Sequence, residues 1–137
     1  MRSHRKHFDW LCLAALLTAC APSHRYTDAE VATAPKLKDI MWSQAQLTDP
    51  QWKKIGRSSY SDADYAGFAD VGRRLELTTA RIRKDFSRGP AFDQLAGTLA
   101  EHATELGQAA TARDAAKASA ALTALRQTCR TCHAQFR

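Results

Sequence analysis

Two cysteines and a histidine near the C-terminus are the residues of this chain best suited to chemistry. Cys129, Cys132 and His133 form a Cys-x-x-Cys-His sequence. On a helix these side chains stand three and four positions apart, so they project from one face. Two thiols and an imidazole at this spacing are the pattern that holds a c-type haem, with thioether bonds to its vinyl groups and the imidazole on its iron. We therefore expect one covalent haem c, with any ligand on the other side of the iron coming from upstream.

The Cys-x-x-Cys pair has two other interpretations. A thiol-redox pair needs a strand, a turn and a helix in a thioredoxin-like setting, and no strand pattern lies nearby. A zinc site needs further ligands at matching spacing, and the chain after residue 19 contains no second Cys-x-x-Cys. Haem attachment is the better interpretation of the motif.

The first nineteen residues have the organisation of an export signal. A basic start precedes an apolar run over residues 10–19, which is too short to span a bilayer. The run ends in Leu-Thr-Ala-Cys, which resembles the lipobox of bacterial lipoproteins. That resemblance implies cleavage before Cys20, lipidation of its thiol, and a periplasmic protein anchored to a bacterial membrane.

This assignment also accounts for every cysteine. Cys12 lies in the removed segment, Cys20 takes the lipid, and Cys129 and Cys132 take the haem. No thiol is then left for a structural disulfide. The alternative is an ordinary secretory signal cleaved near the same point, which leaves Cys20 as a spare thiol.

The composition after residue 19 describes one exported domain. About 118 residues remain, enough for one domain but not two. Their 17 basic and 13 acidic residues give a net charge of +4, against +6 for the whole chain. Nucleic acid is not an expected partner, whereas a mildly basic surface suits an acidic redox protein or anionic headgroups. Residues 20–35 have little apolar periodicity and predict a flexible tether between membrane and domain.

Apolar residues recur at steps of three and four over the rest of the chain, which predicts four helices. Short connections make neighbouring helices antiparallel, so the expected fold is all-α, an up-and-down four-helix bundle over residues 36–137. In chain order, the boundaries between helices are set by Pro35, a capping-box start at Ser61, Gly89-Pro90, a stop at Gly107 and a second box-like start at Thr111.

One boundary stays open, at Asp49-Pro50. Asp49 could cap a new short helix with Pro50 at its first position, running to Gly56. Pro50 could instead kink one longer helix.

A four-helix bundle with Cys-x-x-Cys-His in its last helix resembles the class II cytochromes c, the cytochrome c′ family. The resemblance covers residues 36–137 and implies a haem inside the bundle near one end, with His133 as the proximal ligand. It also implies a first-helix residue on the distal side. Family members with Met there are low-spin, six-coordinate and suited to electron transfer. Members with an apolar non-ligand are five-coordinate and bind nitric oxide or carbon monoxide.

Met41 is the candidate for that distal ligand. It is the only Met after residue 19, and it falls on the apolar stripe of the first helix. The alternative is that Met41 only fills the core. His102, on the stripe of the third helix, is a competing ligand, although such a His is more often a hydrogen-bonded core or boundary residue. His24, in the predicted tether, is a weaker candidate still.

Several other side chains have both a functional and a structural interpretation. Lys36 and Lys38 could pair with haem propionates or remain solvated. Trp42 and Trp52 could pack around the cofactor, although filling the core is the better expectation for both. Four basic side chains near the end of the second predicted helix fit a solvated helix end better than a docking patch, because they complement the C-terminal helix dipole. These side chains are Arg81, Arg83, Lys84 and Arg88.

These residues predict an electron carrier rather than an enzyme. The sequence contains no hydrolytic triad, phosphate loop or paired carboxylate site. We expect redox proteins as partners, with Cys20 providing the membrane anchor, and the sequence leaves open whether the chain forms a homodimer. One alternative is a five-coordinate cytochrome c′ that binds nitric oxide or carbon monoxide. Another is a helical lipoprotein without haem, in which the motif is incidental.

Overall fold

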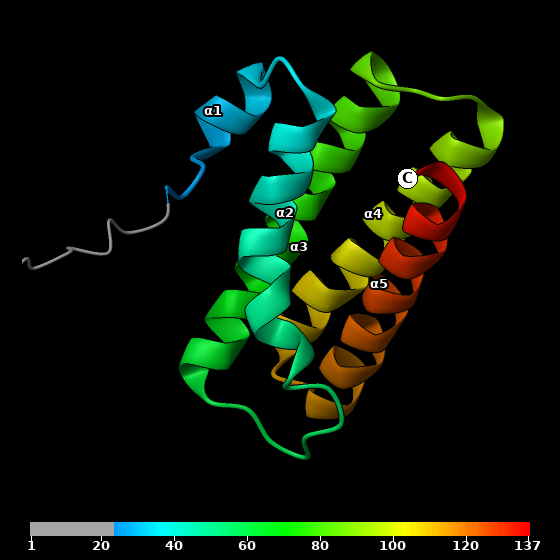
Figure 1. The fold of residues 1–137 in the computed structure, drawn as a ribbon. Helices are drawn as coiled ribbons and strands as arrows, with labels where there is room; N and C mark the ends of the chain where they lie inside the picture. The colour runs from blue at the N-terminus through cyan, green and yellow to red at the C-terminus, as the bar shows by residue number, and fades with distance from the viewer. Residues whose placement is uncertain (1–23) are drawn as a thin grey trace, which may run out of the picture.

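The computed structural model describes residues 24–137, and these residues form five helices without a strand. Helices α2 to α5 make the antiparallel up-and-down bundle, as predicted, and the short helix α1 lies against it (Figure 1). The signal peptide and Cys20 lie outside the described residues. The bounds are α1 Asp28–Thr33, α2 Leu37–Trp52, α3 Asp62–Asp85, α4 Pro90–Ala112 and α5 Ala115–Phe136.

Local capping fixes the start of the second long helix where the sequence predicted it. The Ser61 hydroxyl accepts a hydrogen bond from the Asp64 N–H at 3.2 Å, and an Asp64 carboxylate oxygen accepts one from the Ser61 N–H at 3.0 Å. This reciprocal pair is a capping box. Between α3 and α4 the chain turns at Gly89, whose φ of 103° favours glycine, and Pro90 is the first residue of α4.

Gly107 does not end the third predicted helix, so that prediction was wrong. Helix α4 continues to Ala112 and ends where Arg113 takes a left-handed conformation. Gly107 instead lies where α4 passes closest to Gly72 of α3: a Cβ on Gly72 would lie 3.3 Å from the Gly107 Cα. Small residues at a helix crossing let two backbones approach closely. Packing requires glycine at position 72 of α3, whereas a Cβ added to Gly107 would meet no atom within 4 Å.

One further boundary differs from the sequence prediction, and the boundary that the sequence left open is decided by the structure. Helix α5 begins at Ala115 rather than Thr111, because Asp114 is its N-cap and accepts a hydrogen bond from the Lys117 N–H at 2.9 Å. At Asp49-Pro50, the boundary that the sequence left open, the structure has the longer helix: α2 continues through Pro50 to Trp52. Pro50 has no N–H to donate to the Gln46 carbonyl, so the last turn of α2 lacks one hydrogen bond of its ladder.

Residues 24–34 pack on the bundle, so the predicted tether over 20–35 was wrong for this stretch. Thr27 and Glu30 form a capping box that starts α1. Val31 is fully buried and Ala34 nearly so. A single turn with one buried valine is too short to show a helical period, which is why the sequence pattern missed it. We call residues 24–34 the N-terminal clasp.

Arginines of α3 hold the clasp in place. Arg81 donates to the carbonyl oxygens of Val31 at 2.9 Å and Ala34 at 2.8 Å, and also to that of Ala32. The sequence suggested that Arg81 belongs to a solvated helix end, and for this residue the suggestion was wrong. Carbonyl groups of the clasp accept the hydrogen bonds of the two terminal nitrogens of Arg81, and the Asp85 carboxylate accepts the bond of its Nε.

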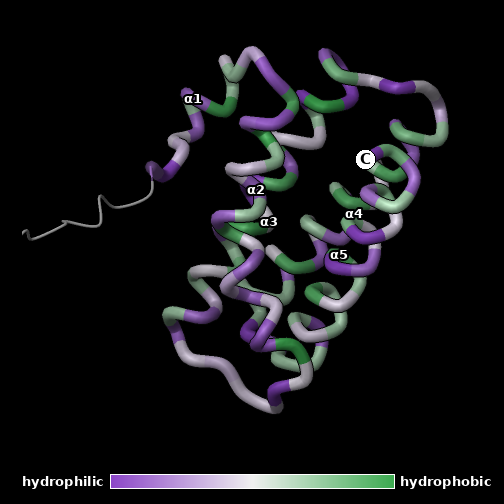
Figure 2. The backbone as a smooth tube through the Cα atoms, viewed as in Figure 1, coloured by the Kyte–Doolittle hydropathy of each residue, from purple (hydrophilic) through white to green (hydrophobic). Residues whose placement is uncertain are grey.

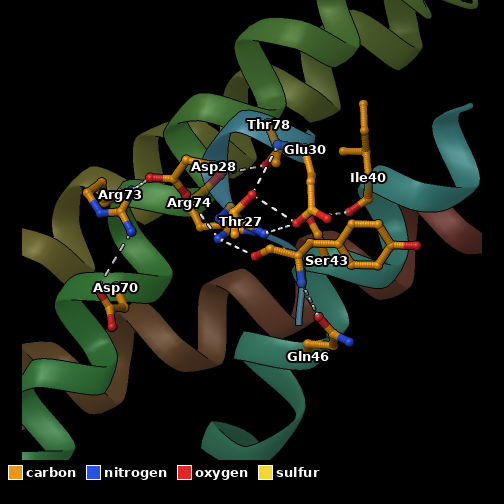
Figure 3. A network of polar contacts seen from close by, with 11 residues as sticks. Thr27, Asp28, Glu30, Ile40, Ser43, Gln46, Asp70, Arg73, Arg74 and Thr78 are labelled. Carbon is orange, nitrogen blue, oxygen red and sulfur yellow. Dashed lines mark hydrogen bonds and ion pairs between the residues drawn. The ribbon is translucent and has the colours of Figure 1, made fainter. Parts of the chain in front are cut away.

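The start of the clasp is held by a second set of polar contacts, shown in Figure 3. Arg74 donates to the Tyr26 carbonyl at 2.9 Å, and its guanidinium lies 2.9 Å from an Asp28 carboxylate oxygen. Arg73 also pairs with Asp28. On the other side, the Gln46 side chain of α2 accepts a hydrogen bond from the Tyr26 N–H at 3.3 Å. The clasp thus links α2 to α3.

The core is divided between two clusters. One lies among α3, α4 and α5 and is built around Phe68, Leu75, Leu106 and Leu122. The second includes Val31 and Ile40 together with Ile82 and Phe92, and Met41 and Cys132 pack against it. Hydrophobic and hydrophilic residues alternate along each helix in the pattern expected of one buried face (Figure 2). Helices α3, α4 and α5 pack extensively, whereas α2 and α5 barely touch.

Candidate haem site

A small cavity of about 30 Å³ lies between the four bundle helices, next to the Cys-x-x-Cys-His sequence. Every bundle helix contributes to its wall, and the wall is almost entirely apolar. The lining residues are Met41 and Gln44 of α2, Thr79 and Ile82 of α3, Phe92, Leu95, Ala96 and Leu99 of α4, and Thr128, Cys129, Cys132 and His133 of α5.

The two cysteines face this cavity one helical turn apart. Burial raises the pKa of the Cys129 thiol to about 11, with a smaller contribution from nearby Cys132 and Asp49. Burial also raises the pKa of Cys132, partly offset by Arg88. Both side chains are therefore neutral thiols near pH 7, without the depressed pKa of a redox-active cysteine. They are free cysteines and not a disulfide.

His133 and Met41 line the same cavity from different helices. His133 follows Cys132 directly on α5 and is exposed to solvent on its outer side. Met41 reaches the cavity from α2 and is half-buried against the cluster that contains Ile82 and Phe92. An imidazole and a thioether are thus brought to one cavity from residues 92 positions apart in the sequence.

Arg88 ties the end of the motif helix to the turn between α3 and α4. Its guanidinium donates a hydrogen bond of 2.6 Å to the Phe136 carbonyl oxygen, and the Phe136 ring packs edge-on against Phe92 at 5.2 Å. The last helical turn after His133 is therefore held against the same end of the bundle as the cavity. Arg88 is exposed, like Arg83 and Lys84, as the prediction of a solvated basic group requires, and it has this hydrogen bond in addition.

Comparison with known proteins decides the family. A family described as Cytochrome C' matches residues 65–137, more than half of the chain. The chain belongs to the cytochrome c′ family. No curated protein matches it, and no solved structure matches it either.

The family match begins at Tyr65 and so covers nearly all of α3, together with α4 and α5. It includes the Cys-x-x-Cys-His sequence and implies a covalently bound haem c. Helix α2 lies outside the match, so the family assignment says nothing of Met41 or of the distal side. That side is described by the geometry of this chain alone.

The residues around the cavity fit such a haem. Two thiols and an imidazole stand on one face of α5, and apolar side chains such as Ile82, Phe92 and Leu99 supply the wall that a porphyrin needs.

A zinc site has less support. Within residues 24–137, no group of three or more His, Cys, Asp or Glu side chains converges as metal ligands would. Cys129, Cys132 and His133 face a common cavity without forming a chelate. The two thiols suit attachment to a ligand larger than an ion.

The competing histidines lie away from the cavity. His102 is on α4, where its Nδ1 lies 2.9 Å from a Glu105 carboxylate oxygen, and it does not line the cavity. His24 is exposed, and its Nε2 lies 3.0 Å from a Glu30 carboxylate oxygen. Both histidines therefore pair with nearby carboxylates.

Both tryptophans and both lysines of interest lie outside the cavity wall. Trp42 is 56% exposed, so the expectation that it fills the core was wrong. Trp52 packs at the edge of the first core cluster, and its indole N–H donates to Asp49 at 3.1 Å. Lys36 and Lys38 are exposed at the start of α2.

Sequence reasoning missed three polar residues of the cavity wall as functional candidates. These are Gln44, Thr79 and Thr128. The threonines bond to carbonyl groups one turn back in their own helices. Gln44 is nearly buried and donates to the Thr78 hydroxyl at 2.7 Å. A glutamine on an otherwise apolar stripe was the signal available in the sequence.

Proposed function

We propose that this cytochrome c′ family member is a monohaem electron carrier of the bacterial periplasm, anchored to a membrane through a lipid on Cys20, rather than an enzyme. One observation carries the electron-transfer function. Met41 lines the same cavity as Cys129, Cys132 and His133, from the opposing helix α2. A thioether facing the haem-attachment helix is the group that favours a six-coordinate, low-spin iron.

Each residue has a role in this proposal. Cys129 and Cys132 would hold the haem through thioether bonds, and His133 and Met41 would supply ligands to its iron. The bound haem supplies one-electron chemistry between ferric and ferrous iron. Apolar neighbours such as Phe92 exclude water from the iron, and packing of α3, α4 and α5 limits the rearrangement that accompanies each electron.

Visible spectra of the holoprotein and a Met41→Ala variant test the ligand. The protein is produced in a bacterial periplasm with cytochrome c maturation, and oxidised and reduced spectra are recorded. We expect sharp low-spin bands that Met41→Ala converts to high-spin bands, with a lower reduction potential. Leu47→Ala is the matched control, since Leu47 is a half-buried residue of α2 that does not line the cavity. High-spin bands already present in the unchanged protein would reject ligation by Met41.

Gas binding is the alternative function, and the family match favours it because its description is that of cytochrome c′. This function requires Met41 to leave the iron open. Rapid carbon monoxide binding by the reduced protein, at the same rate in Met41→Ala, would support it. Slow binding that Met41→Ala accelerates would support the electron carrier.

The proposed location rests on the lipobox resemblance. No helix within residues 24–137 is long and apolar enough to cross a membrane. Intact mass spectrometry of the membrane fraction tests the anchor, because lipidation of Cys20 adds the mass of a diacylglycerol group. Redox proteins are the proposed partners, and sedimentation would detect a homodimer if the chain forms one.

A further inference from the structure

The first described residues, His24 to Tyr26, lie against the face of α2 that carries Gln46. We call this the outer face of α2. Gln46 accepts a hydrogen bond from the Tyr26 N–H at 3.3 Å, and its side-chain nitrogen also donates to the His24 carbonyl. Gln46 therefore fixes the position of His24 on the bundle. Figure 3 shows Gln46 meeting the clasp from the α2 side, opposite the arginines of α3.

Trp42 lies one helical turn before Gln46, on the same face of α2. It is 56% exposed, and it is the large hydrophobic side chain that residues 24–137 leave exposed. Lys38 precedes it by another turn and is also exposed, as is Arg25 next to His24. Asp39 is the nearby acidic residue on α2, and it is half-buried. Trp42 and Lys38 thus share the face of α2 that leads to Gln46, which bonds the start of the clasp. In the clasp itself, Arg25 is exposed and the acidic Glu30 pairs with His24.

The distance from His24 to Cys20 is short. Four residues span at most about 14 Å when fully extended. This step depends on the proposed lipid anchor at Cys20. If the anchor is present, the N-terminal clasp shortens the predicted 16-residue tether to these four residues, and the outer face of α2 cannot lie far from the membrane.

We infer that the face of α2 formed by Lys38 and Trp42, with Arg25 of the clasp, is a membrane-contact surface. Indole side chains favour the interface between water and headgroups, where an apolar ring and a polar N–H are both accommodated. Lys38 and Arg25 complement anionic headgroups. The short anchor keeps the bundle close to the membrane, and contact through Trp42, Lys38 and Arg25 fixes the orientation of the bundle on it.

This orientation directs the haem-attachment helix away from the membrane. In Figure 1 the described chain begins at the left of α2, whereas α5 lies to the right of α2, on its other side. The exposed side of α5 carries Arg126 and Arg130, Arg137 follows its last residue, and α5 contains no acidic residue. The basic side of the haem helix would therefore face the periplasm and its redox partners.

Hydroxyl-radical footprinting tests the surface on the holoprotein. The lipidated protein is reconstituted in vesicles of phosphatidylethanolamine and phosphatidylglycerol, and a non-lipidated form is made behind an ordinary secretory signal. Oxidation rates of Trp42 and Trp52 are read by mass spectrometry. We expect Trp42 to be oxidised about fivefold more slowly on vesicles, since the interface shields an inserted indole. Half-buried Trp52 is the internal control and should be unchanged.

A charge reversal separates this surface from anchoring alone. Lys38→Glu should abolish most of the Trp42 protection, whereas Lys53→Glu, at the exposed far end of α2, should preserve it. Equal oxidation of Trp42 in both forms, with the lipid confirmed by intact mass, would overturn the inference and leave the anchor standing. Protection that grows with concentration in the non-lipidated form would overturn it in favour of a second copy. Absence of lipid would reject the anchor itself, and this surface with it.

Discussion

Gln44 of α2 donates a hydrogen bond of 2.7 Å to the Thr78 hydroxyl of α3, beside the cavity that Met41 also lines. The Thr78 hydroxyl in turn donates to the Arg74 carbonyl at 2.8 Å. Both side chains are buried. Because α2 has little contact with α5, this bond to α3 is one of the interactions that position the helix carrying Met41.

Replacing Thr78 by valine should destabilise the protein by about 1–3 kcal/mol, because the buried Gln44 amide loses its acceptor. The free energy of unfolding, measured by denaturant titration of the holoprotein, checks this. Thr123→Val is the control, since Thr123 is exposed and should change stability by less than about 0.5 kcal/mol. Equal effects at the two sites would show that the Gln44 bond contributes nothing.

Gly72→Ala should destabilise the bundle by about 1–3 kcal/mol or more. A Cβ at this position would lie 2.8 Å from the Ala103 carbonyl oxygen, and a backbone atom cannot move aside as a flexible side chain can. A Cβ added to Gly97 of α4 would have no atom within 4 Å, so Gly97→Ala should stabilise by up to about 1 kcal/mol through helix propensity. Thermal unfolding of both variants would distinguish them. A neutral Gly72→Ala would mean that α3 and α4 can separate freely here.

Arg81→Met should release the N-terminal clasp without unfolding the bundle. The change removes hydrogen bonds to the carbonyl groups of Val31, Ala32 and Ala34. Bonds that involve a charged donor are typically worth about 1.5–3 kcal/mol each, so α1 should lose most of its protection. Hydrogen exchange over residues 28–34 should become fast while α4 stays protected.

Arg83→Met is the control for this prediction, because Arg83 is exposed on the same helix. Its exchange pattern should match that of the unchanged protein. Loss of protection throughout the bundle in Arg81→Met would contradict a local role. Unchanged exchange over residues 28–34 would show that the other contacts, among them burial of Val31 and the Arg74 pair with Asp28, hold the clasp without Arg81.

Asp64 should make the free energy of unfolding depend on pH between about 4 and 2. The Lys54 ammonium, together with the Ser61 N–H and hydroxyl, holds the pKa of Asp64 at about 2, below its ordinary 3.8. A depressed pKa in the folded state gives stability that is complete above about pH 4 and is lost as the pH falls towards 2. Asp64→Asn and Lys54→Met should both flatten the unfolding free energy between pH 4 and 2, measured by urea titration. A slope unchanged in both variants would exclude this carboxylate as its source.

The sequence determined the bundle and one side of the candidate site. Helical periodicity, the Ser61 capping box and Gly89-Pro90 are local signals, and each acts over a few residues, so the main helices could be predicted from them. The spacing of Cys129, Cys132 and His133 likewise implies their common face, because a single helix fixes it. The family match agrees with that side of the site.

Tertiary structure decided what depends on contacts between distant segments. Helix α4 passes through Gly107 and ends at Arg113, and Arg81 is not solvated because residues 31–34 supply carbonyl acceptors about 50 residues earlier in the chain. Val31 turns a predicted tether into a packed clasp, and Trp42 is exposed although its type suggested the core. Only the bundle brings Met41 to the cavity of His133. Local rules cannot foresee these outcomes, since a residue's burial depends on which surface the folded chain places against it.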